Sequence, residues 1–73
     1  MKVTEQEYLK RVGQNIAKLR KEKGFSQTNV CDHIKMEKSN LSAIENGRQN
    51  FTALTLKKIA DFIGVEVKEF FKI

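Results

Sequence analysis

The stretch SQTNVCDHIKMEKSNLSAIENG, residues 26–47, contains two short helical patterns joined by a tight connection. Ser26 can cap the first helix, in which Val30 and Ile34 lie four residues apart on one inward face. That helix is expected to end near Ile34. The second helix is expected over residues 38–46, with apolar side chains on one face and polar or small side chains on the other. This arrangement predicts a helix-turn-helix.

The segment before this stretch predicts a longer helix over residues 5–23. Thr4 can cap it, and Val12 and Ile16 recur at the spacing of one helical face. Gly13 lies inside this helix at a cost of about 1 kcal/mol relative to alanine. We therefore expect Gly13 to permit the close approach of another helix.

Two further helices are expected after residue 47. Thr52 can cap a fourth helix, and residues 65–71 form a short fifth one. The inward face of the fourth helix carries Leu56, Ile59, Ala60 and Ile63, and glycines mark three helix ends at Gly24, Gly47 and Gly64. Since no linker or repeat interrupts the chain, the sequence predicts one all-α domain over residues 1–73, folded as a compact five-helix bundle.

The composition excludes several classes of protein. Hydrophobic residues make up 40% of the 73 residues, so the chain is too apolar to be disordered. Charged residues make up 32%, which is too high a fraction for a membrane protein. Without a spanning helix or secretory signal, a cytoplasmic location is expected. The net charge of +5 would attract a polyanion.

The single cysteine argues against disulfides and metal sites. Cys31 has no partner for an internal disulfide, and with one histidine, His33, it cannot build a zinc site alone. We expect Cys31 to be a buried structural thiol and His33 to be solvated on the outer face of its helix. No metal and no cofactor is predicted.

The order of short motifs resembles the lambda-repressor/Cro-like, or Xre-type, helix-turn-helix family over about residues 12–71. The motifs are Arg20, Ser26-Gln27, Val30-Cys31, Ser42-x-x-Glu45-x-Gly47-Arg48, Leu56-x-x-Ile59-Ala60 and Gly64-Val65. The resemblance implies a dimeric transcriptional regulator, most often a repressor, that binds a palindromic operator in double-stranded DNA. Residues 38–46 would then lie in the major groove.

The resemblance also implies roles for individual residues. Gln27 and Arg48 would hold backbone phosphates, and Lys38 and Ser39 would reach base edges. The full DNA-binding set is Gln27, Lys38, Ser39, Asn40, Ser42, Ala43, Asn46, Arg48 and Asn50. Arg20 and Glu45 would form a structural pair between the first and third helices.

Several positions depart from the family pattern. Lys35 stands where glycine is frequent, and a left-handed backbone there costs about 1 kcal/mol. Glu37 replaces the usual Ser or Thr cap and could accept a hydrogen bond from cytosine N4. Phe51 stands where proline is common, and Cys31 where alanine is usual.

A dimer interface is expected in the last third of the chain, and its candidate residues are Phe51, Phe62, Phe71 and Ile73. The alternative is that these side chains complete the core around Leu54 and Val67.

No nucleophile, base or acid pair indicates an enzyme. A protein-interaction module such as an antitoxin or coactivator is the alternative function, and RNA binding is less favoured because the chain has one Tyr and no Trp.

Overall fold

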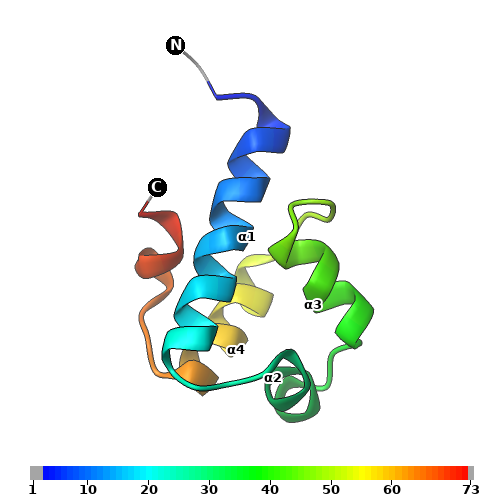
Figure 1. The fold of residues 1–73 in the computed structure, drawn as a ribbon, viewed down its shortest axis with the longest axis vertical. Coiled ribbons are helices and arrows are strands. Elements are labelled where there is room, and N and C mark those ends of the chain that lie inside the picture. The colour runs from blue at the N-terminus through cyan, green and yellow to red at the C-terminus, as the bar shows by residue number, and fades with distance from the viewer. Residues whose placement is uncertain (1–2, 73) are drawn as a thin grey trace.

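Residues 3–72, which the computed structural model describes, form four α-helices and one 3-10 helix (Figure 1). The elements are α1 (Glu5–Glu22), α2 (Gln27–Ile34), α3 (Lys38–Glu45), α4 (Ala53–Ile63) and the 3-10 helix η1 (Val67–Phe71). The predicted all-α fold is therefore confirmed, and the first four predicted helices agree with the observed ones to within one residue.

Side-chain caps define the starts of three helices, as the sequence predicted. The hydroxyls of Thr4 and Thr52 each accept a hydrogen bond from the backbone three residues on, at 3.1 Å. Ser26 and Asn29 form a reciprocal pair, in which each side chain accepts from the backbone N–H of the other, at 3.0 and 2.8 Å. These bonds satisfy N–H groups that have no partner within the helix.

The predicted fifth α-helix is wrong in type and in its start. Gly64 adopts a left-handed conformation at φ 85° and ends α4, and Glu66 is extended. Only the five residues Val67–Phe71 then form a helix, and the Glu69 N–H donates to the Glu66 carbonyl at 3.0 Å. Because so short a segment closes few hydrogen bonds, the i to i+3 pattern of a 3-10 helix takes the place of an α-helix.

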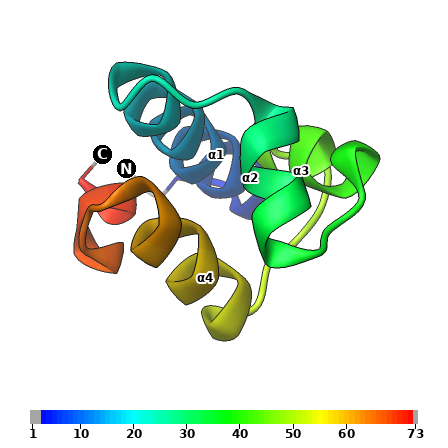
Figure 2. The same ribbon diagram turned by 90° about the horizontal axis from the view of Figure 1, so that it is seen from below.

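The long helix α1 lies between α3 on one side and η1 on the other (Figure 1), while α2 contacts both α3 and α4 (Figure 2). The core is built from one apolar face of each element: Val12, Ile16, Val30, Cys31, Leu41, Ile44, Leu56, Ile59, Ala60, Ile63 and Phe70. Phe70 is fully buried, so the 3-10 helix closes the core. The Asn15 amide holds it by donating to the Phe70 carbonyl at 3.2 Å.

At Gly13, α1 approaches the backbone at the end of α3 closely. A Cβ atom at this position would lie 2.7 Å from the Glu45 carbonyl oxygen and closer still to the Ile44 carbonyl oxygen. Both atoms belong to the backbone at the end of α3, so neither can turn aside as a side chain would. The expectation that Gly13 permits close approach is confirmed.

The apolar residues in the last third of the chain divide between core and surface. Leu54 is 62% exposed, so the alternative in which it anchors the core is wrong. Phe51 is half-buried and meets the exposed Phe71 ring edge-on, with centroids 6.4 Å apart. Phe62 is half-buried. The fourth candidate for the dimer interface, Ile73, lies outside the described residues.

Two absences hold over residues 3–72. None of the helices combines the length and apolar character that crossing a bilayer requires. In the same part of the chain, no three side chains of the metal-binding types gather closely enough to hold an ion.

Candidate nucleic-acid interface

The turn between α2 and α3 is built around Lys35. This residue has φ 60° and ψ 50°, and it is the one non-glycine residue with positive φ within residues 3–72. The Met36 N–H donates to the Cys31 carbonyl at 3.0 Å, which closes the end of α2. The left-handed turn predicted for Lys35 is confirmed, so the connection forms without glycine.

The start of α3 projects away from the core. Glu37 is the N-cap residue, but its side chain makes no capping hydrogen bond within the described residues. Lys38, Ser39 and Asn40 are all exposed, whereas Leu41 on the opposite face is fully buried. The first turn of α3 therefore presents an ammonium, a hydroxyl and an amide to a partner.

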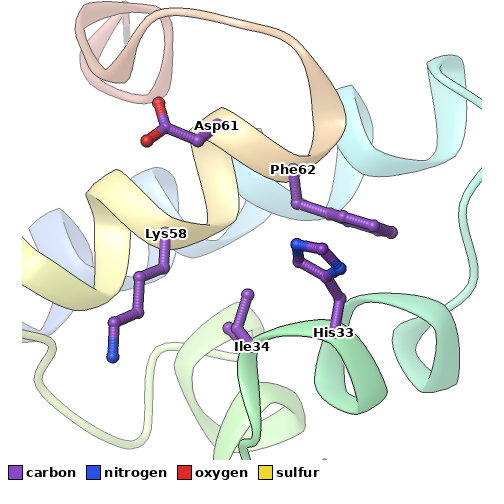
Figure 3. A pocket seen from close by; sticks show the side chains of 5 residues that line it. All are labelled: His33, Ile34, Lys58, Asp61 and Phe62. Carbon is purple, nitrogen blue, oxygen red and sulfur yellow. The ribbon is translucent and has the colours of Figure 1, made fainter.

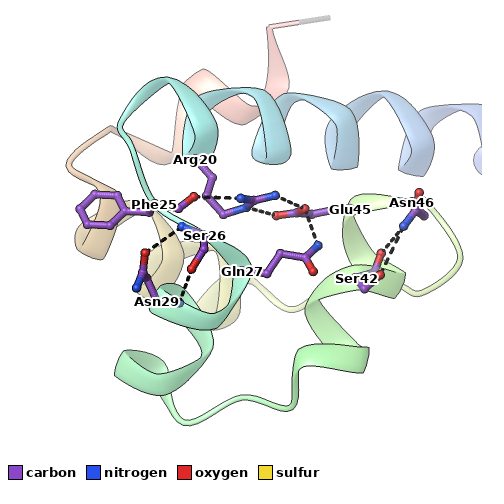
Figure 4. Close-up of polar contacts among 8 residues, drawn as sticks. All are labelled: Arg20, Phe25, Ser26, Gln27, Asn29, Ser42, Glu45 and Asn46. Carbon is purple, nitrogen blue, oxygen red and sulfur yellow. Dashed lines mark hydrogen bonds and ion pairs between the residues drawn. The ribbon is translucent and has the colours of Figure 1, made fainter.

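A buried ion pair connects α1 to the end of α3 (Figure 4). The Arg20 guanidinium donates from Nε to Glu45 Oε2 at 2.8 Å and from Nη2 to Glu45 Oε1 at 2.9 Å. Its Nη1 donates to the Phe25 carbonyl at 2.9 Å. Both side chains are about 5% exposed, so this is a desolvated bidentate ion pair. Its charge-assisted hydrogen bonds are stronger than those between neutral groups.

Gln27 joins the same pair from α2. Its Nε2 donates to Glu45 Oε1 at 2.9 Å, so one carboxylate ties together α1, α2 and α3 (Figure 4). The hydrogen bonds that Arg20 donates to the Glu45 carboxylate raise the pKa of Arg20 above its ordinary value, although burial acts in the opposite direction. The sequence pointed to the pair but not to this third partner. The only available signal was the place of Gln27 in the first turn of its helix.

The other residues of the predicted DNA-binding set lie on α3 and in the loop that follows it. Ser42 and Ala43 are half-buried on α3, and the Asn46 amide donates to the Ser42 carbonyl at 2.8 Å. Arg48 is exposed in the loop after α3. The side chain of Asn50 is also exposed, and it accepts from the next backbone N–H at 2.8 Å. The surface around the Arg20–Glu45 pair thus includes Gln27, Ser42 and Asn46 (Figure 4), whereas Asn40 lines a separate groove with Thr55 and Lys58 of α4.

Two predictions about α2 are tested away from this surface. Cys31 is 5% exposed, and burial raises the pKa of its thiol, as expected for a structural cysteine. His33 is exposed, as predicted, and it also makes a contact that the sequence did not indicate. Its imidazole stacks on Phe62 with centroids 4.3 Å apart, beside a cavity of about 420 Å³ that Lys58 and Asp61 also line (Figure 3).

The chain matches known proteins over most of its length. A family model described as a helix-turn-helix domain matches residues 13–72. The HTH-type transcriptional regulator y4dJ of Sinorhizobium fredii is 43% identical over 56 residues, which are 77% of this chain and 73% of that protein. The control protein C.MunI of a Mycoplasma species is 37% identical over 62 residues, or 84% of each protein.

A solved structure shares the same architecture. The restriction-modification controller protein C.AhdI of Aeromonas hydrophila superimposes with a TM-score of 0.81 at 28% identity, over 86% of this chain and 96% of that one. The predicted resemblance is confirmed by these matches. The chain belongs to the Xre/Cro-like family of helix-turn-helix domains.

Proposed function

We propose that this protein is a transcriptional regulator that binds specific sites in double-stranded DNA with α3 in the major groove. The observation that carries the proposal is the first turn of α3, where Lys38, Ser39 and Asn40 are exposed. The other end of this helix is held against α1 by the ion pair between Arg20 and Glu45. A helix held in this way offers donors and acceptors to base edges without having to be ordered on binding.

The proposed contacts fall into two groups. Lys38 suits the major-groove acceptors of guanine, Ser39 and Asn40 can meet several bases, and the Ala43 methyl suits thymine. The second group positions the protein on the backbone and comprises Gln27, Ser42, Asn46, Arg48 and Asn50. For Gln27, one amide N–H bonds within the protein, and the second N–H of the same group is the one proposed to donate to a phosphate.

A homodimer on a palindromic operator is proposed because one recognition helix gives few contacts. The exposed apolar side chains that support it are Leu54 and Phe71, and the Phe71 ring packs edge-on against half-buried Phe51. Leu54→Arg is expected to shift the sedimentation of the protein from dimer to monomer, because it places a charge in an apolar interface. Thr28→Arg, at an exposed site on α2, is the control for added charge. A wild-type chain that stays monomeric at high concentration, with and without DNA, would contradict the dimer.

Lys38→Ala tests direct base contact. Duplexes selected by the wild-type protein from a random pool are expected to lose about tenfold in affinity, because a lost pair of base contacts costs about 1–3 kcal/mol. Binding to unselected duplex should change far less. Arg48→Ala, in contrast, is expected to weaken all duplexes alike and to lower the salt dependence of log K by about one.

Fluorescence anisotropy across a salt series measures both effects. Lys57→Ala is the matched control, since this lysine pairs with Asp61 on α4 and is not in the proposed contact set. If the wild-type chain binds no duplex even at low salt, the DNA-binding function is refuted and a protein-interaction module replaces it.

A further inference from the structure

A groove runs between α1 and the helix-turn-helix, on the side of α1 that faces α3. It has a volume of about 540 Å³. Gln14, Lys18 and Lys21 line it from α1, and Gln27 and Asn46 line it from the helix-turn-helix. None of these α1 residues belongs to the DNA-binding set that the sequence or the family resemblance indicated.

The charges along this groove are unbalanced. At its floor, the Arg20 guanidinium and the Glu45 carboxylate cancel each other, since they form the buried pair. Lys18 and Lys21 are exposed, and within residues 3–72 neither forms an ion pair. They are three residues apart on one helix and therefore lie on the same face. The lining thus carries two positive charges that no protein carboxylate neutralises.

The opposite wall of the groove holds two amides. The Gln27 amide donates to Glu45, and the Asn46 amide donates to the Ser42 carbonyl at 2.8 Å and to the Ser42 hydroxyl at 3.5 Å. These internal bonds fix the two amide groups in place, and Gln27 keeps a second N–H that can donate. Two ammonium groups on one wall and an oriented amide N–H on the other match the oxygens of a phosphodiester, which accepts hydrogen bonds and carries one negative charge.

We propose that this groove binds a DNA backbone phosphate beyond the base pairs that α3 contacts, with Lys18 and Lys21 as its ligands from α1. The inference rests on the proposed DNA-binding function. A strand whose phosphates meet Gln27 and Asn46 runs along the mouth of the groove, because both residues form its wall. Helix α1 is then part of the DNA interface as well as a support for α3.

The double variant Lys18→Ala/Lys21→Ala tests the groove. With two phosphate contacts removed, the slope of log K against log salt is expected to fall by about two, and affinity at low salt by about tenfold. The loss should be equal for selected and unselected duplexes, because a phosphate carries no sequence information. Both side chains are exposed, so the circular dichroism melt should match that of the wild type.

The matched control is Lys68→Ala/Lys72→Ala, which removes the same charge from the other side of α1, where η1 lies (Figure 1). This control is expected to keep nearly the wild-type slope. If the two double variants lose slope equally, or neither loses any, the groove is not a phosphate site while the proposed DNA-binding function stands. If the wild-type chain shows no salt-dependent binding, both proposals fail.

Discussion

Replacing Glu45 with alanine is expected to lower the free energy of unfolding by about 3–5 kcal/mol, because it leaves a buried guanidinium without its counter-charge. Arg20 makes two of its three hydrogen bonds to this carboxylate, at 2.8 and 2.9 Å. A chain of this length has a total stability of about 4–11 kcal/mol at the usual value per residue. The substitution thus removes a large part of it, and thermal melts should shift down by about 15 °C or more.

Two comparisons separate the buried pair from general effects of charge. Glu66→Ala breaks the ion pair between Glu66 and Lys68, in which both side chains are more than 70% exposed. This substitution should lower the free energy of unfolding by no more than about 1 kcal/mol. The double variant Arg20→Met/Glu45→Leu removes both charges and should recover much of the loss, because apolar side chains of similar volume often replace a buried pair. If Glu45→Ala melted like Glu66→Ala, the pair would not be the tie between α1 and α3.

Gly13→Ala is expected to destabilise the fold by about 2–3 kcal/mol, although the same change would stabilise an isolated helix by about 1 kcal/mol. The added methyl would lie 2.7 Å from the Glu45 carbonyl oxygen and nearer to that of Ile44, so α3 must move away from α1. The sign of the measured change therefore decides between helix propensity and packing.

Urea denaturation measures this effect, with Gln14→Ala as the control at the next position. Gln14 is exposed, so alanine there should leave stability within about 0.5 kcal/mol of the wild type. Should Gly13→Ala stabilise the protein, the close approach of α1 and α3 would be wrong. If the Gly13→Ala variant is destabilised but still unfolds cooperatively, its DNA binding can also be measured. Such a measurement tests the effect of a shifted α3, since α3 must move relative to α1 in this variant.

Features that depend on neighbouring residues could be predicted from the sequence. The caps at Thr4, Ser26 and Thr52 use hydroxyls and backbone groups three residues apart. The inward face of each α-helix follows from its 3.6-residue period. Such signals are complete within one turn or one helix.

Features that depend on several elements could not be predicted in the same way. The stacking of His33 on Phe62 joins α2 to α4. The bond from Gln27 to Glu45 joins residues 18 positions apart. For η1, the difference between an α-helix and a 3-10 helix rests on a few hydrogen bonds, which a pattern of apolar residues does not resolve.

The central place of α1 has a consequence for how the chain folds during synthesis. This helix is made before α3 and η1, yet its two faces pack on them, and fully buried Phe70 lies more than fifty residues after Ile16. An isolated helix of 18 residues is only marginally stable in water. At about 5–20 residues per second, the ribosome needs several seconds to supply Phe70 after α1. During that interval α1 carries an exposed apolar face, and a nascent chain of this protein is then most open to chaperones and proteases.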